Sequence, residues 1–125
     1  MDARTIVLDD SAGDVLTVVV RGEHDIYTAP GLRDRLDEAI GAGPTGVIVD
    51  LSAATFLDSS ILGALLEARR QALERGHGYV VFLGEDPEPG VARILEITGL
   101  VPVFPVVRST EEALATARSS ASADA

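Results

Sequence analysis

The alternation of apolar runs with polar, glycine-containing segments predicts a chain in which strands and helices alternate. Short runs rich in β-branched residues and bounded by turn residues are typical of strands. Such runs occur at residues 6–8, 15–20, 46–51, 79–83 and 103–107. The run at 46–51 is almost wholly apolar, which indicates a central strand covered on both faces.

Between these strands, apolar residues recur every three or four positions, as they do along one face of a helix. Helices are therefore expected at 28–41, 61–76 and 91–99, and from Ser109 onward. Thr28 and Ser109 stand where N-cap residues are expected. The resulting order, β-β-α-β-α-β-α-β-α, predicts an α/β fold with a mixed β-sheet of about five strands flanked by about four helices.

The length of 125 residues fits one domain. A hydrophobic content of 46% supplies a core without disulfide or metal crosslinks. We assign residues 1–118 to a single domain. The tail at 119–125 consists of small and polar residues with nothing to bury, which predicts disorder.

Charge and composition exclude several classes of function. The chain has 20 Asp+Glu against 10 Lys+Arg, a formal net charge of −10, so its field repels nucleic-acid backbones and anionic lipids. We expect neither nucleic acid nor membrane as a partner. Cysteine and lysine are absent, which removes thiolate and Schiff-base chemistry and the phosphate-binding lysine loop. With an acidic start and no long apolar segment, a cytoplasmic location is expected.

Serine hydrolysis is one enzymatic interpretation, with Ser59 or Ser60 as nucleophile and His24 or His77 as base. The Gly-x-Ser-x-Gly turn that exposes such a nucleophile is missing, and we expect both histidines at the surface. The histidine spacing does not suit a metal, and no glycine-rich phosphate loop is present. We expect no enzymatic activity and no cofactor.

The step Asp58-Ser59-Ser60 has two interpretations. Asp and Ser are good helix N-caps, so the step could simply begin a helix. Alternatively, it exposes hydroxyls inside an apolar contact patch, because Phe56-Leu57 precede it and Ile61-Leu62 follow it.

Several segments, in order and with matching spacing, resemble the STAS-domain anti-sigma factor antagonists of bacteria. They are residues 21–29, 49–60, 92–100, 103–105 and 109–114. The segment ending at Asp25 is similar to the family's Gly-Glu-Leu-Asp segment, and Asp58-Ser59-Ser60 is similar to its phosphorylation loop. The resemblance implies the STAS fold, a mixed sheet flanked by helices, which agrees with the element order above.

The resemblance also implies a partner-switching function in transcription regulation, of the stress-response or sporulation type. The unmodified antagonist binds an anti-sigma factor that is also a serine kinase, and the sigma factor is released. The kinase then phosphorylates the antagonist, the two part, and a metal-dependent serine phosphatase restores the antagonist. By position, the phosphoacceptor is Ser59.

The residues expected to contact the partner surround this serine. They are Asp25, Tyr27, Thr28, Leu57, Asp58, Ser60, Ile61 and Leu62. Ile61 departs from the family, which commonly has Gly there, and would place a branched side chain where a kinase must approach the backbone. His24 stands where the family often has an apolar residue. The alternative function is a constitutive STAS scaffold or sensory module, in which Ser59 is only a helix cap.

Overall fold

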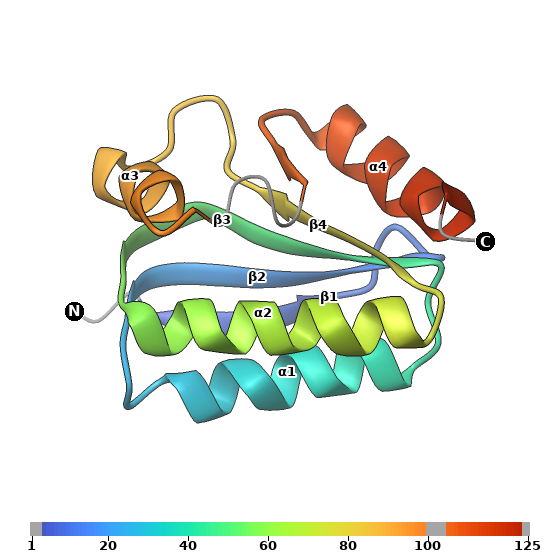
Figure 1. The fold of residues 1–125 in the computed structure, drawn as a ribbon, viewed down its shortest axis with the longest axis horizontal. Helices are drawn as coiled ribbons and strands as arrows, with labels where there is room; N and C mark the ends of the chain where they lie inside the picture. Colours follow the sequence, from blue (N-terminus) through green and yellow to red (C-terminus); the bar gives the residue numbers. More distant parts are fainter. Residues whose placement is uncertain (1–3, 100–104, 124–125) are drawn as a thin grey trace.

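The computed structural model describes residues 4–99 and 105–123 of the chain. Strands and helices alternate as the sequence predicted (Figure 1). The strands are β1 (Thr5–Asp9), β2 (Val15–His24), β3 (Gly46–Leu57), β4 (Gly78–Phe82) and β5 (Val106–Val107). The helices are α1 (Ala29–Gly41), α2 (Ser59–Glu74), α3 (Pro89–Ile97) and α4 (Thr110–Ala123). The predicted fold class, a mixed sheet with flanking helices, is confirmed.

The strands form one sheet in the order β1-β2-β3-β4-β5. The hairpin makes β1 antiparallel to β2, and each later pair is parallel. The run at 46–51 is therefore central, as predicted. Because β2 and β3 are parallel, their carboxyl ends, His24 and Leu57, lie side by side in the register. The loops that follow these two strands therefore meet at one end of the sheet.

The two faces of the sheet are covered by different helices. In β2, β3 and β4, alternate residues point to opposite faces. Val18, Val49 and Val81 pack in the larger core cluster with the buried residues of α1, α2 and α3. Val15, Ile48 and Val80 pack in a smaller cluster with α4. Figure 1 shows α1 and α2 lying together along one side of the sheet and α4 on the other side.

β3 is longer than the sequence predicted. The expected strand ended at 51, and residues 52–60 were interpreted as a polar interruption, but β3 continues to Leu57. The β2–β3 pairing shifts register twice, between Val19 and Arg21 and between Gly22 and Glu23, and each shift adds one residue on the β3 side while the strands stay paired. In this part of β3 the buried residues are Ala54 and Leu57, three positions apart, so the alternation expected of a strand is lost.

The C-terminal part of the chain differs from the prediction in extent. Of the strand expected at 103–107, β5 comprises Val106–Val107, while positions 103 and 104 lie outside the described residues. Ser109 caps the last helix as expected, since its Oγ accepts a hydrogen bond from the Glu112 N–H at 3.1 Å. The helix runs to Ala123 and so includes residues that had been assigned to a disordered tail. None of the helices described is long and apolar enough to cross a bilayer.

Candidate functional site

Asp58 joins the two loops at the carboxyl ends of β2 and β3. It is the N-cap of α2, and its Oδ1 accepts hydrogen bonds from the N–H groups of Ser60 and Ile61 at 2.9 and 3.3 Å. Its Oδ2 accepts a hydrogen bond from the Ile26 N–H at 3.1 Å. One carboxylate therefore stabilises the start of α2 and holds the β2–α1 loop against it. The loops that follow β2 and β3 are thus in direct contact through this side chain.

Ser59 is the first residue of α2 and is exposed. Within the described part of the chain its hydroxyl makes no hydrogen bond. Asp58, not a serine, caps the helix, so the cap interpretation holds for the aspartate alone. Ser60 is half-buried and contributes its backbone N–H to the cap. Ser59 thus presents a hydroxyl beside a carboxylate and is not needed to begin the helix.

The β2–α1 loop is fixed by reciprocal hydrogen bonds between Asp25 and Thr28. The Asp25 N–H donates to Thr28 Oγ1 at 2.9 Å, and the same hydroxyl donates to the Asp25 carbonyl at 3.1 Å. Asp25 Oδ1 accepts from the Tyr27 N–H at 2.9 Å. Thr28 occupies the N-cap position of α1 but makes no side-chain cap bond to the helix, which corrects the expected role of its hydroxyl. The loop is therefore shaped before any partner is present.

Three of the expected apolar contact residues lie in the core. Leu57, Ile61 and Leu62 are all buried among the hydrophobic residues of the sheet and helices. They are not available to a partner on this surface, and the expectation that they form part of the contact is withdrawn. The branched side chain of Ile61 points into the molecule, so it does not obstruct an approach to Ser59 from outside. Sequence pattern could not separate these positions from surface ones, because the start of α2 is apolar on both sides of the serines.

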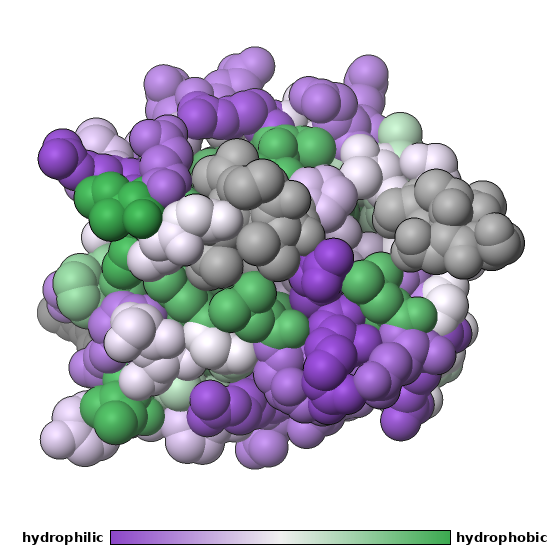
Figure 2. Space-filling model, in the orientation of Figure 1, coloured by the Kyte–Doolittle hydropathy of each residue, from purple (hydrophilic) through white to green (hydrophobic). Residues whose placement is uncertain are grey.

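Other apolar residues are exposed near the same end of the molecule. Ile26 and Tyr27 in the β2–α1 loop are 62% and 87% exposed, and Phe56 near the end of β3 is 49% exposed. Ile97, at the end of α3, is 70% exposed. We call Ile26, Tyr27 and Phe56 the apolar rim of the site. Figure 1 places α3 and the starts of α1 and α2 at one end, where Figure 2 shows hydrophobic residues gathered at the surface.

Of the rim, Tyr27 was expected from the sequence, whereas Ile26 as a contact residue was missed. The missed signal is its position: Ile26 follows Asp25 in a short loop between a strand and a helix, where an apolar side chain has no core to enter. The predicted contact residues Asp25, Tyr27, Thr28, Asp58 and Ser60 are brought together around the paired loops.

The arrangement gives no support to hydrolysis or metal binding. His24, expected at the surface, is buried, with 1% exposed, and its Nε2 is 2.7 Å from the Arg21 carbonyl oxygen. No serine hydroxyl is hydrogen-bonded to a histidine in the residues the structure describes. Across residues 4–99 and 105–123, no group of His, Asp and Glu side chains could hold a metal ion. What the geometry offers is a surface with a free hydroxyl, two carboxylates and an apolar rim.

A family model described as the STAS domain matches residues 8–113. The chain belongs to the STAS domain family. An anti-sigma F factor antagonist of Paenibacillus polymyxa is 32% identical over 101 residues, covering 80% of this chain and 84% of the relative. The crystal structure of an anti-sigma factor antagonist from Mycobacterium paratuberculosis superposes with a TM-score of 0.80 at 30% identity, covering 94% and 96% of the two chains.

The structure of the Bacillus cell fate determinant SpoIIAA in the phosphorylated form shares the STAS fold, with a TM-score of 0.66 at 22% identity, covering 89% of this chain and 97% of that one. The similar proteins are regulatory binding proteins and not enzymes. The names of these similar proteins confirm the expectation that this chain is not an enzyme.

Proposed function

We propose that this STAS protein is an anti-sigma factor antagonist. Its unmodified form binds an anti-sigma factor that is also a serine kinase, and phosphorylation of Ser59 ends that binding. The observation that carries the proposal is the exposed, unbonded Ser59 hydroxyl at the start of α2, next in the chain to Asp58, whose carboxylate also binds the Ile26 N–H of the apolar rim. The names of the similar proteins supply the class of partner.

The chemistry of the switch involves one phosphoryl transfer and its reversal. The γ-phosphoryl group of ATP is transferred to Ser59 Oγ, a new O–P bond replaces the bond to ADP, and the hydroxyl proton passes to a base of the kinase. A metal-dependent serine phosphatase returns the chain to its starting state by transferring the phosphoryl group to water. SpoIIAA, which shares the fold, occurs in a phosphorylated form.

A phosphate at Ser59 acts on the surface and not on the fold. It brings a charge of about −1.5 to −2 at neutral pH. The N–H groups of Ser60 and Ile61, at the start of α2, already donate hydrogen bonds to Asp58. The phosphate would therefore stand beside the Asp58 carboxylate without these two N–H groups to neutralise it. Because Ser59 is exposed and Asp58 caps the helix, the domain stays folded. A partner covering the apolar rim would have to desolvate this concentrated charge, which disfavours the complex.

Two variants of Ser59 test the switch. Wild type, Ser59→Ala and Ser59→Asp are each titrated with the anti-sigma factor kinases of the same genome, with binding followed by calorimetry. We expect Ser59→Ala to bind like the unmodified wild type and Ser59→Asp to bind at least about tenfold more weakly. Ser119→Asp is the matched control, because it adds the same charge at an exposed position of α4.

Equal binding by Ser59→Ala and Ser59→Asp would contradict the switch. It would favour the alternative, a constitutive STAS scaffold or sensory module in which Ser59 has no regulatory role. A uniform loss of binding in both Ser59→Asp and Ser119→Asp would show that net charge, and not the site, controls the interaction.

A further inference from the structure

A groove of about 260 Å³ lies between the sheet and the start of α4. Apolar side chains of the sheet and of α4 line it, among them Val19, Phe82 and Leu114. Two carboxylates, Asp9 at the end of β1 and Asp50 in β3, line it as well, and no Arg or His does. The groove is therefore an apolar hollow with two anionic side chains, and its volume suits a ligand smaller than a drug-sized molecule.

The groove exists because α4 covers only part of this face of the sheet. Val15, Ile48 and Val80 are buried in the cluster with α4, whereas Val19, farther along β2, is only half-buried. β2 and β3 are parallel, and parallel strands are usually covered on both faces. Val19 is paired with Asp50 in that register, so the incompletely covered stretch of the sheet is the one that carries this carboxylate.

The two carboxylates are held by hydrogen bonds but are not balanced by a cation. Asp9 accepts a hydrogen bond from the Ser11 N–H at 2.9 Å, and Asp50 accepts from the Ser52 N–H and hydroxyl at 2.9 and 2.6 Å. The hydrogen bonds from Ser11 lower the pKa of the Asp9 carboxyl below its ordinary value. Across residues 4–99 and 105–123, neither carboxylate forms an ion pair. Both are therefore fixed acceptors that a cation can reach.

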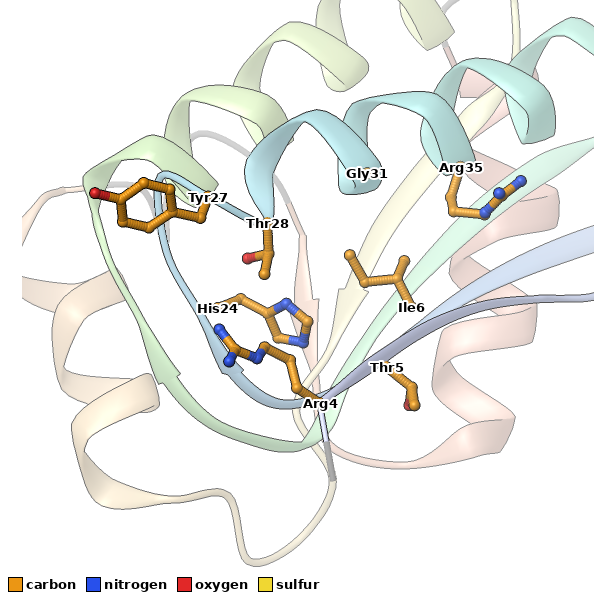
Figure 3. Close-up of a pocket in the computed structure, with 8 residues that line it drawn as sticks. All are labelled: Arg4, Thr5, Ile6, His24, Tyr27, Thr28, Gly31 and Arg35. Carbon is orange, nitrogen blue, oxygen red and sulfur yellow. The ribbon is translucent and has the colours of Figure 1, made fainter. Parts of the chain in front are cut away.

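Two other cavities do not combine these features. One, beside the β1–β2 turn, is lined by Asp10 and Asp14, but Asp14 is ion-paired with Arg118. The other, between β1 and α1 on the opposite face of the sheet (Figure 3), is lined by Arg4 and Arg35 and by no acidic residue. The groove beside α4 differs from both, because its carboxylates have no cationic partner and apolar side chains lie between them.

The strand register sets the spacing of Asp9 and Asp50. Asp9 is paired with Thr17, which in turn is paired with Ile48. Asp50 lies two residues beyond Ile48 and therefore on the same face. Two strand spacings across the sheet and two residues along it put the Cα atoms of Asp9 and Asp50 about 12 Å apart. Thr17 and Val19 line the groove between them. A ligand that neutralises both carboxylates therefore needs two positive ends and an apolar middle.

We propose that this groove binds a linear aliphatic diammonium ion, with one ammonium group at Asp9, the other at Asp50 and the methylene chain over Val19. The ammonium–carboxylate hydrogen bonds are charge-assisted, with N···O distances of about 2.7–2.9 Å. With one such contact at each end, a chain of about five carbons spans the distance between the two side chains. The apolar wall of the groove removes the methylene groups from water. The inference does not depend on the proposed switch, because Ser59 does not line the groove.

The test is a titration of the full-length ¹⁵N-labelled protein with cadaverine, in which a pentyl chain joins two ammonium groups, at constant ionic strength. Amide chemical shifts report binding, and we expect saturable shifts centred on Thr17, Val19 and Thr110. Pentylamine, which has the same chain and one charge, is the matched ligand control. It should bind at least about tenfold more weakly than cadaverine, because one charge-assisted contact is lost. Propanediamine, which is too short to reach both carboxylates, should bind as weakly as pentylamine.

Variants of the two carboxylates test their roles. Asp9→Asn and Asp50→Asn each keep an oxygen that can accept the serine hydrogen bonds, and each should lower cadaverine affinity at least about tenfold, to the level of pentylamine. Asp37→Asn, at an exposed position of α1 outside the groove, is the matched control and should bind like wild type. The comparison of ligands uses the wild type, so the test stands even if a variant does not fold.

Three results would overturn the proposal: shifts that do not saturate, equal affinities for cadaverine and pentylamine, or equal weakening of cadaverine binding by Asp37→Asn. Each would show that cations gather on the acidic surface in general and not in this groove.

Discussion

The Ile26 N–H donates a hydrogen bond to Asp58 Oδ2 over 3.1 Å, although the two residues are 32 positions apart in the chain. The other oxygen of the same carboxylate caps α2 through Ser60 and Ile61. The start of the helix that carries Ser59 and the loop that carries the apolar rim are therefore held by one side chain. A change at Asp58 should affect both.

Two substitutions at Asp58 separate the effect of its hydrogen bonds from the effect of its negative charge. Asp58→Ala removes the cap and the bond to Ile26, and should lower the free energy of unfolding by about 0.5–2 kcal/mol. Asp58→Asn keeps an oxygen that can cap the helix, so this variant should lower the free energy of unfolding by a smaller amount. Urea unfolding measures the free energy of unfolding, and hydrogen exchange at the Ile26 amide reports on its hydrogen bond to Asp58. Unchanged exchange at Ile26 in Asp58→Ala would contradict the role given to this contact.

The apolar rim should contribute binding energy without contributing to the fold. Tyr27→Ala removes the most exposed large apolar side chain of the site. If the rim is the contact surface, binding to the anti-sigma factor should weaken by at least about tenfold, as for an aromatic hot spot. The free energy of unfolding should change by less than about 0.5 kcal/mol.

Val7→Ala is the control for the rim, since Val7 is a half-exposed apolar residue of β1 outside the two loops. It should leave partner binding unchanged. Should Tyr27→Ala and Val7→Ala bind equally well, the partner surface would lie elsewhere.

Two glycine-to-alanine changes should alter stability in opposite directions. A Cβ at Gly46 would stand 2.3 Å from the Ala117 carbonyl oxygen, where β3 packs against α4. Gly46→Ala should therefore lower the free energy of unfolding by about 1–3 kcal/mol. A Cβ at Gly63, on the exposed side of α2, would meet nothing within 4 Å. Because alanine favours a helix more than glycine does, Gly63→Ala should raise the free energy of unfolding by about 0.5–1 kcal/mol. Thermal unfolding of the pair checks the packing of α4, and a tolerated Gly46→Ala would show that α4 is not seated there.

Asp14 and Arg118 connect the β1–β2 turn to α4 by hydrogen bonds of 2.8 and 3.0 Å. The Arg118 guanidinium lowers the pKa of the Asp14 carboxyl below its ordinary value. Because the folded-state pKa is below the unfolded one, the stabilisation is present above the unfolded pKa and is lost as the pH falls through the folded pKa. Both side chains are about half-exposed, so the effect on stability is small.

An NMR titration of the carboxyl carbons measures this pair directly. Arg118→Gln should raise the pKa of Asp14 toward its ordinary value. The Asp9 pKa, which is lowered by the Ser11 backbone N–H, should not move and serves as the control. An unaltered Asp14 pKa in Arg118→Gln would contradict the contact.

The fold could be predicted from the sequence because its elements have strong local patterns. The apolar run at 46–51 identified the central strand, and helical spacing identified the helices. The extension of β3 to Leu57 could not be predicted, because two register shifts, each with an extra residue in β3, interrupt the alternation expected of a strand. Such irregularities depend on tertiary packing and leave no periodic pattern in a single segment.

The site was predicted in part, and the errors have one cause. The resemblance to the antagonist family pointed to Asp25, Asp58 and Ser59, and in the structure the parallel pairing of β2 and β3 brings their loops together. Leu57, Ile61 and Leu62 were expected to contact the partner but lie in the core. His24 was expected at the surface but is buried. Burial at the end of a strand or the start of a helix depends on how the helices pack onto the sheet, which the local sequence does not determine.

The most direct test of the central claim is phosphosite mapping by mass spectrometry on the protein isolated from its native cells with phosphatases inhibited. The proposed switch predicts a fraction carrying one phosphoryl group, located on Ser59, which changes with growth or stress conditions. A phosphoryl group found at another residue, or none under any condition, would contradict regulation through Ser59.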